Sequence, residues 1–397
     1  MTPDIPAIQT ALRAHGLDGW LLYDFHGSNP IARRLAGLDG SAKLTTRRWY
    51  YLIPARGEPR ALVHRIERHS LEHLPGARRE YAGREELATG LEALLDGMAR
   101  LAMEYSPRCA IPYLSRVDAG TVEGVRELGT EVVSSGDLVQ RFEAVWNAAA
   151  LASHRDASAR LYDIKDRAFD LIAAEVGGGA LTEYAVQTAM TGWFAEQGLV
   201  TDSPPVVAAQ ASSGNPHYMP TAERHRPIRT DELVLIDLWG KLDRPGSVFA
   251  DITWMAYTGR RVPDDYAAVF AVARDARDAA VALVRERTRS GTPPCGWEVD
   301  RAARDVIEAA GHGEHFVHRT GHSLGEAVHG NGVHMDDYET HDERRLLTGS
   351  GFTIEPGIYF DRFGVRTEVN VYVDAHDATV TGPLQGEIAA LGQESNR

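Results

Sequence analysis

Four acidic residues interrupt apolar, β-branched runs within the last 161 residues of this 397-residue chain. They are Asp237 in VLIDLWG, Asp251 in FADITW, Glu355 in FTIEPGIYF and Glu368 in GVRTEVNVYV. Runs of this kind are typical of buried strands, where an ionised carboxylate is costly unless a cation or hydrogen-bond donors compensate it. The aspartates lie 14 positions apart across KLDRPGS and the glutamates 13 apart around DRFG, so each pair is expected on one β-hairpin.

Four carboxylates held close together would repel one another and raise one another's pKa values. Two divalent cations among them would balance the four negative charges. His322, in HRTGHSLG, adds a nitrogen donor, and a set so rich in oxygen suits manganese, with cobalt, iron or zinc as alternatives. The sequence therefore predicts a two-metal site, and its expected ligands are Asp237, Asp251, His322, Glu355 and Glu368.

Three further histidines stand near these positions. His318 and His329 share the glycine-bearing segment HRTGHSLGEAVHG with His322, at spacings of four and seven, and His217 stands in NPHYMP, 20 residues before Asp237. An isolated histidine is usually an ordinary surface or core residue, and the chain has 16 of them. The close spacing around His322 instead favours a place in the same site.

Composition argues against several other kinds of protein. The net charge of −14 argues against a nucleic-acid binder, which usually carries a basic face. Cys109 and Cys295 are too few for a disulfide framework and lack CxxC spacing, which indicates a reducing compartment. The N-terminal residues lack a basic flank with an apolar core, and no run of 18 apolar residues occurs, so neither a signal peptide nor a membrane span is expected. We expect a cytoplasmic protein.

Residues 1–143 alternate between helical and strand-like patterns and are expected to form an α/β domain. The expected elements are a helix at 7–15, strands at 17–24, 49–54 and 59–64, a helix at 91–101, and strands at 108–114 and 130–135. The segment HRIERHSLEH invites a zinc interpretation through His64, His69 and His73, but their spacing equally suits exposed loop or helix residues, which we favour.

Residues 144–397 are expected to form the second domain. A helical stretch from about Glu143 to Glu175 ends at the triplet Gly177–Gly179, so we place the boundary near Glu143. Amphipathic helices are predicted at 181–198 and 296–313, the first before the aspartate pair and the second before the histidine segment and the glutamate pair. This weak repeat predicts two pseudo-equivalent halves that close on one central site.

In order along the chain, IDLWG, ADITW, HRTGHSLG, TIEPGIY and VRTEV resemble the motifs of the pita-bread metallopeptidases, in particular the proline-specific branch of prolidase and aminopeptidase P. The resemblance covers about residues 143–373. The first domain resembles the creatinase-like domain of that branch, which methionine aminopeptidases typically lack. The resemblance implies an N-terminal creatinase-like α/β domain followed by an α+β pita-bread domain with pseudo-two-fold internal symmetry.

The resemblance also assigns ligands to metals. Asp237 would bind one metal, and Asp251 and Glu368 would bridge or reach both. His322 would bind the second metal together with Glu355. A hydroxide bridging the metals would attack the carbonyl before proline, while Glu355 would carry the proton from the water to the leaving nitrogen.

The same resemblance implies supporting residues. The auxiliary histidines of the family fall on His217, His318 and His329, of which His329 would stabilise the oxyanion and His318 would orient the substrate. Arg366 and Tyr359 match positions on the substrate side.

Two arginines of the first domain are weaker candidates for binding the substrate carboxylate. Arg47 and Arg48 in KLTTRRWYYL lie where relatives place a segment that reaches a neighbouring subunit's site, although solvated arginines at a strand edge are the interpretation that the sequence favours. We expect a homodimer.

The expected function is cleavage of Xaa-Pro dipeptides by a dinuclear-metal hydrolase. An aminopeptidase P acting on longer Xaa-Pro peptides is the alternative. A metal-free creatinase-like hydrolase and an inactive pita-bread binding module are disfavoured, because all the carboxylate ligands are present.

The sequence departs from the family pattern at three points. The two aspartates are further apart than usual, which predicts a longer turn. His217 is correspondingly further upstream, and Gly330 follows His329 where many relatives have an acidic residue.

Overall fold

The computed structural model describes residues 3–38 and 45–392. The chain divides into two compact units, Met1–Phe142 and Glu143–Arg397, and each is considered by itself. Within the described residues, no helix is both long and apolar enough to cross a membrane.

The first unit is built on a six-stranded mixed sheet with strand order β4-β3-β2-β1-β5-β6. Its strands are β1 (Gly19–Asp24), β2 (Trp49–Pro54), β3 (Arg60–His64), β4 (Ala77–Tyr81), β5 (Arg100–Met103) and β6 (Glu131–Ser134). Its helices are α1 (Ile5–Ala14), α2 (Pro30–Leu35), α3 (Arg84–Leu95), α4 (Ala119–Glu127) and α5 (Gly136–Val139). This is the expected α/β unit.

Both faces of this sheet are buried, because every residue of β1 and β2 is buried. Side chains alternate between the faces of a strand. Trp20 of β1 and Ile53 of β2 therefore pack in the core that contains α1, whereas Leu21 of β1 and Leu52 of β2 pack in the core that contains α3. The apolar runs of this unit thus form central strands that helices cover on both sides.

Two of the elements predicted for this unit are wrong. The helix predicted at 91–101 ends at Leu95, and after Gly97, whose φ is +76°, the chain enters strand β5 at Arg100. The strand predicted at 108–114 is instead two 3₁₀ turns, Pro107–Cys109 and Pro112–Leu114. A proline has no N–H to donate to a ladder, and this favours turns over a strand there.

The second unit contains four long helices and several small sheets. Its helices are α6 (Ala148–Glu175), α7 (Glu183–Glu196), α8 (Asp264–Arg289) and α9 (Gly296–Ala309). Its strands are β7 (Leu199–Val200), β8 (Val206–Ala209), β9 (Leu233–Leu242), β10 (Ala250–Tyr257), β11 (Gly351–Ile354), β12 (Gly357–Phe360), β13 (Phe363–Arg366), β14 (Val369–Val373), β15 (Ala378–Val380) and β16 (Ala389–Ala390).

The residues that flank helix α6 explain where it begins and ends. The side chain of Asn147 accepts a hydrogen bond from the backbone N–H of Ala150, which caps the N-terminus. The helix runs to Glu175, and Gly179 then takes a φ of +72° that suits glycine. The predicted glycine break is confirmed, although the helix starts five residues later than the predicted Glu143.

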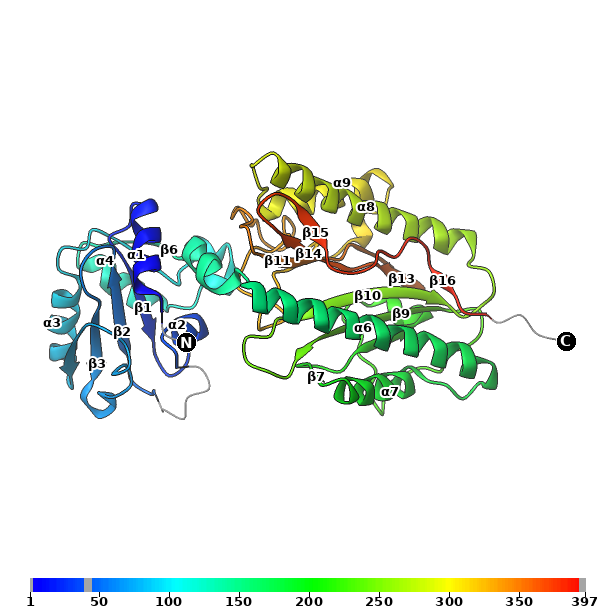
Figure 1. Ribbon diagram of the computed structural model, residues 1–397, viewed down its shortest axis with the longest axis horizontal. Helices are drawn as coiled ribbons and strands as arrows, with labels where there is room; N and C mark the ends of the chain where they lie inside the picture. The colour runs from blue at the N-terminus through cyan, green and yellow to red at the C-terminus, as the bar shows by residue number, and fades with distance from the viewer. Residues whose placement is uncertain (1–2, 39–44, 393–397) are drawn as a thin grey trace. The chain divides into compact units, whose positions relative to one another are not determined.

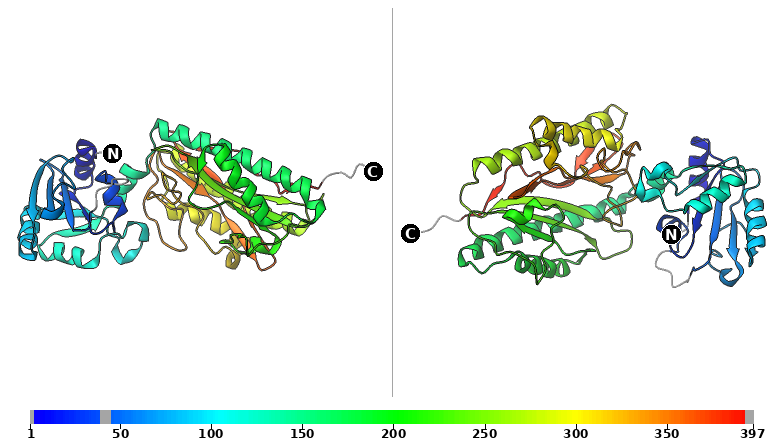
Figure 2. Two further views of the ribbon diagram at one scale, coloured as in Figure 1. Left: turned by 90° about the horizontal axis from the view of Figure 1, so that it is seen from below. Right: turned by 180° about the vertical axis from the view of Figure 1, so that it is seen from behind.

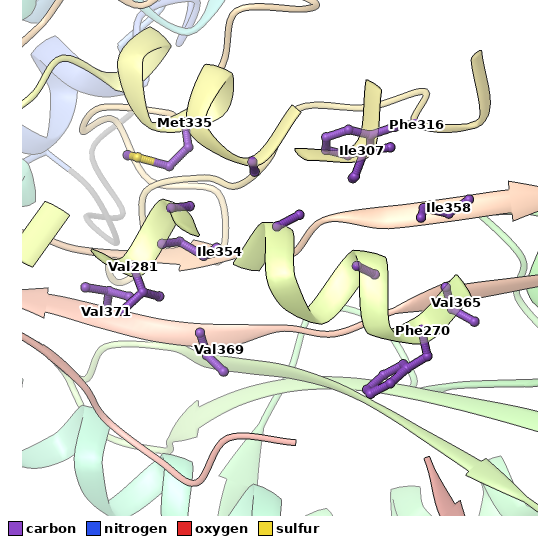
Figure 3. Packing of buried hydrophobic residues seen from close by; sticks show 14 of the residues in the cluster. Phe270, Val281, Ile307, Phe316, Met335, Ile354, Ile358, Val365, Val369 and Val371 are labelled. Carbon is purple, nitrogen blue, oxygen red and sulfur yellow. The ribbon is translucent and has the colours of Figure 1, made fainter. Parts of the chain in front are cut away.

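Each half of this unit is a pair of helices followed by a hairpin. Helix α6 lies along β9 and β10, and α7 contacts α6, β7 and β8; in the second half α8 lies against β11, β13 and β15, and α9 packs on α8 (Figures 1 and 2). Figure 3 shows the second of these cores, where Val281 of α8 lies near Ile354 and Val371, and Phe270 of α8 lies near Val365. The expected repeat of helices and a hairpin is present.

Strand alternation decides which side chains face the centre of this unit. On β9, Ile236 and Leu238 join the core beneath α6, so Asp237 and Trp239 face the opposite side. On β14, Val369 and Val371 join the core beneath α8, so Glu368 faces away from it. The acidic residues therefore meet between the two helix-covered layers.

Candidate metal centre

The two aspartates come from neighbouring positions of one antiparallel pair. In the β9–β10 register, Asp237 lies opposite Thr253 and Asp251 lies opposite Trp239. The aspartates are thus offset by two residues and share a face of the hairpin. The turn between the strands spans residues 243–249.

The two glutamates lie where a second hairpin is interrupted. Glu355 stands between β11 and β12, and Glu368 stands between β13 and β14. Pairing resumes on both sides, with Ile354 opposite Val369 and Gly357 opposite Arg366. The backbone N–H of Glu368 donates to Thr253 O at 3.2 Å, which joins this hairpin to β10.

His322 enters the site from the loop between α9 and β11. Its backbone N–H donates to Thr353 Oγ1 at 2.9 Å, and the N–H of Thr353 donates to His322 O at 2.9 Å. Its Nε2 then lies 3.5 Å from Asp251 Oδ2 and 3.3 Å from Glu355 Oε1. Asp251, His322 and Glu368 each offer a ligand atom, and these atoms lie within 4.8 Å of one another.

The buried carboxylates of the cluster repel one another, and a positive charge among them would stabilise their ionised forms. Burial, and then repulsion from Glu368 and Asp237, raises the pKa of Asp251 well above its ordinary value. Burial, and then repulsion from Glu355 and Asp237, does the same to the pKa of Glu368. Burial raises the pKa of Glu355 to about 7, although Arg366 opposes the rise.

Two carboxylate oxygens of the cluster are buried without hydrogen-bond donors from the described residues, namely Asp251 Oδ1 and Glu368 Oε1. An orphaned buried carboxylate oxygen is costly unless a cation compensates it. Asp251, His322 and Glu368 are buried and close together, and two of their carboxylate oxygens have no donor among the described residues. Asp237 and Glu355 are partly buried. These four carboxylates and one imidazole are ligands of the kind that fits divalent cations.

Arg366 is buried and gives three of the site's polar groups a donor. Its Nη2 forms an ion pair with Asp237, its Nε donates to Thr253 Oγ1 at 3.0 Å, and its Nη1 donates to the Tyr359 hydroxyl at 3.2 Å. Burial raises the pKa of Asp237, and Arg366 opposes that rise.

His318 is held in one tautomer. Its Nδ1 lies 2.7 Å from Arg319 O, an acceptor, so Nδ1 carries the proton. Its Nε2 consequently accepts from the Tyr359 hydroxyl, at 2.8 Å. Burial lowers the pKa of His318 to about 3, so the ring is neutral at neutral pH.

His329 and His217 both lie at the exposed edge of the site. The His329 ring lies 4.4 Å from the His322 ring, and burial followed by the charge of Arg319 lowers its pKa to about 4. His217 is exposed, and its backbone N–H donates to Asn215 Oδ1 at 3.1 Å. Its charge also lowers the pKa of His329, so the two histidines share one electrostatic neighbourhood.

Arg47 and Arg48 belong to the first unit, and both are exposed. The backbone N–H of Arg47 donates to Glu67 Oε2 at 3.0 Å, and Arg48 O accepts from the Tyr81 hydroxyl at 2.8 Å. Their predicted contact with substrate stays a prediction.

The three histidines of the zinc interpretation bind separate partners. His64 contacts Ala82 O at 3.1 Å, His69 contacts Glu72 at 2.8 Å, and His73 contacts Ala36 O at 2.7 Å. Among the described residues, the group close enough together to share a metal ion is Asp251, His322 and Glu368, and none of these three histidines belongs to it.

Sequence reasoning missed the polar residues that hold the ligands. Thr253 Oγ1 donates to Glu368 Oε2 at 2.8 Å, Thr353 Oγ1 donates to Glu355 Oε1 at 3.0 Å, and Asn370 Oδ1 accepts from the backbone N–H of Asp251 at 3.0 Å. Each stands two positions from a ligand on a buried strand, so period-two polar residues were an available signal. Arg319 is also missing from the prediction, although its charge affects the pKa values of Glu355 and four nearby histidines.

A buried ion pair on α9 holds the segment that carries His318. Arg304 Nε donates to Asp300 Oδ2 at 2.8 Å, and Arg304 Nη2 donates to His318 O at 2.8 Å. Asp300 Oδ1 accepts from the N–H of Thr320 at 2.8 Å, and Thr320 O accepts from the N–H of Glu355 at 2.7 Å. Helix α9 is thereby connected to the backbone of two site residues.

Comparison with known proteins fits this arrangement. The model of metallopeptidase family M24 matches residues 152–375. An Xaa-Pro dipeptidase of Lactobacillus helveticus is 35% identical over 164 residues, which make up 41% of this chain and 40% of that protein. The matched segment is thus less than half of the relative.

Two solved structures are similar over nearly the whole chain. Dipeptidase PepE from Mycobacterium ulcerans has a TM-score of 0.72 and 24% identity, and the match covers 98% of this chain and 97% of that chain. A prolidase from Thermococcus sibiricus has a TM-score of 0.66 and 21% identity, with 97% of this chain and 98% of that chain covered. The expected α/β domain followed by a pita-bread domain is confirmed.

Proposed function

Since the chain belongs to metallopeptidase family M24, we propose that it hydrolyses the peptide bond before proline, with Xaa-Pro dipeptides as its preferred substrates. The observation that carries the proposal is the buried cluster of Asp251, His322 and Glu368, whose orphaned oxygens fit divalent cations. The relative named Xaa-Pro dipeptidase supports the choice of substrate.

The ligands of two divalent ions would be Asp237, Asp251, His322, Glu355 and Glu368, with manganese as the proposed metal and cobalt, iron or zinc as substitutes. Bound there, the ions supply a water of lowered pKa and an electrophile for the substrate carbonyl.

Glu355 transfers the proton in this proposal. It takes a proton from the attacking water and delivers it to the proline nitrogen as the bond breaks. Thr353 Oγ1, 3.0 Å from Glu355 Oε1, holds the carboxylate in place for both steps. Proton delivery matters because a bond before proline releases a secondary amine.

His329 serves as a donor to the developing oxyanion. With its pKa at about 4, its ring is neutral at pH 7 and presents one N–H. A hydrogen-bond donor beside His322 stabilises the charge that develops on the carbonyl oxygen. His217 lies on the exposed side of the same neighbourhood and assists there.

His318, Tyr359 and Arg366 form one hydrogen-bonded row on the substrate side. The hydrogen bonds of Arg366 within the described chain leave one of its five N–H groups for a substrate carboxylate. We further propose a cytoplasmic homodimer in which Arg47 or Arg48 helps to close the product side.

Comparison of a dipeptide with a longer peptide tests the substrate class. The metal-loaded protein should cleave alanyl-proline faster than Ala-Pro-Ala-Ala, because a carboxylate reader next to proline disfavours an extended chain. Equal rates for the two peptides would assign the protein as an aminopeptidase P, and no cleavage of either would refute the proposal.

A further inference from the structure

Trp239 places an aromatic ring beside the metal ligands. It lies directly opposite Asp251 in the β9–β10 register and two residues after Asp237 on the same face of β9. The side chain is only partly buried. One wall of the site is therefore an indole ring.

Asp202 precedes β8 and fixes this ring. Trp239 Nε1 donates to Asp202 Oδ1 at 2.6 Å. Asp202 is exposed, and its second oxygen, Oδ2, accepts no hydrogen bond from the residues that the structure describes. The indole N–H thus orients a carboxylate that keeps one oxygen for a ligand.

Asp202 and Trp239 both neighbour residues of the metal-ligand cluster. Asp202 is near enough to His329 for its charge to raise the pKa of that histidine. The His329 ring lies 4.4 Å from the His322 ring, and His322 Nε2 lies 3.5 Å from Asp251. Asp251 in turn lies opposite Trp239 in the hairpin, so Asp202 and Trp239 both lie on the side of the cluster where His329 stands.

We propose that Asp202 and Trp239 bind the free α-ammonium group of the substrate, an inference that rests on the proposed function. A carboxylate next to an aromatic face is a combination that recognises ammonium groups. The α-nitrogen lies only about 2.5 Å from the carbonyl carbon that is attacked, by standard backbone dimensions. The ammonium group must consequently lie beside the metal ligands, where this wall stands.

The pair would also set the end from which peptides are cleaved. A peptide extended or acylated at its N-terminus presents a neutral amide in place of the ammonium group, and this amide gains no ion pair with Asp202. Asp202 and Trp239 therefore determine specificity for substrates whose N-terminal residue is free.

The test uses two substrates that differ in one group, alanyl-proline and propionyl-proline, which lacks the ammonium. For Asp202→Asn in the metal-loaded full-length protein, we expect KM for alanyl-proline to rise about tenfold while kcat stays within about threefold. KM for propionyl-proline should not change. Trp239→Phe, which keeps a ring but loses the indole N–H, should raise KM for alanyl-proline by a smaller factor.

Asp243→Asn is the matched control, because it removes the same charge from the exposed turn of the β9–β10 hairpin. Its KM values should equal those of the wild type. Equal KM changes in the two asparagine variants would overturn the inference. So would an equal rise in KM for propionyl-proline, since the effect of Asp202 would then not depend on the ammonium group. Failure of the wild type to cleave alanyl-proline would instead refute the proposed function itself.

Discussion

Replacement of Arg304 by methionine should destabilise the second unit far more than the same change at Arg301, three residues earlier on α9. Arg304 and Asp300 are 4% and 0% exposed, and they hold one another with two hydrogen bonds. Arg304→Met leaves the Asp300 carboxylate buried without its counter-charge. It also removes the donor of the Phe316 and His318 carbonyl groups.

The two substitutions should lower the free energy of unfolding by different amounts, because one ion pair is buried and the other is exposed to solvent. Removal of one partner of a buried pair costs about 3–5 kcal/mol, which corresponds to a fall in Tm of roughly 10 °C for a unit of this size. Arg301 pairs with Asp305 and Glu308 on the surface, where an ion pair contributes only about 0–1 kcal/mol.

Thermal unfolding followed by tryptophan fluorescence measures both variants. Arg304→Met should also lower kcat at temperatures where it is folded, because α9 no longer holds the backbone of His318. Double-variant analysis with His318→Ala should show that the two losses in kcat do not add. Equal losses of Tm for Arg304→Met and Arg301→Met would refute this reasoning.

The other predictions concern pH and chemistry. Burial lowers the pKa of His154 to about 4 from its ordinary 6.5, so stability is fully present above pH 6.5 and is lost as pH falls toward 4. Between pH 8 and pH 5 this histidine should cost about 2 kcal/mol of unfolding free energy, and urea titrations of His154→Gln should lack that part of the slope. Glu355→Gln should remain folded by circular dichroism while kcat for alanyl-proline falls at least about 100-fold, and a rate near wild type would remove its role as proton carrier. His329→Ala should lose turnover but keep its metal in elemental analysis, and loss of metal would make it a ligand instead.

The four acidic residues of the proposed ligand set stand out in the sequence because each interrupts an apolar, strand-like run. A carboxylate in a run such as VLIDLWG is costly without compensation, and the two hairpins follow from the spacing of the acidic residues. The structure brings Asp251, His322 and Glu368 together and places Asp237 and Glu355 near enough to raise the pKa values of Asp251 and Glu368.

Contacts between distant segments could not be predicted. Arg366 meets Asp237 across 129 residues, and Thr253 meets Glu368 across 115. The sequence around each of these residues does not indicate which distant residue it contacts. The pair of Asp300 and Arg304 has ordinary helical spacing, and only burial against the His318 segment distinguishes it from a surface pair.

Local patterns were also misleading in the first unit. Strand β4 was not predicted because its first four residues are exposed, as befits an edge strand, and they show no apolar alternation. The segment 91–101 was assigned to one helix because its apolar residues continue past Leu95, yet Gly97 ends the helical pattern and Leu101 belongs to a buried strand.

Titration of metal-free protein with manganese, followed by hydrolysis of alanyl-proline and by elemental analysis, tests most directly whether the five predicted ligands form a two-metal catalytic site. We expect no hydrolysis after chelation, a rise in rate as manganese is added, and a plateau at two ions per chain. Full hydrolysis by protein that elemental analysis finds free of metal would contradict this account.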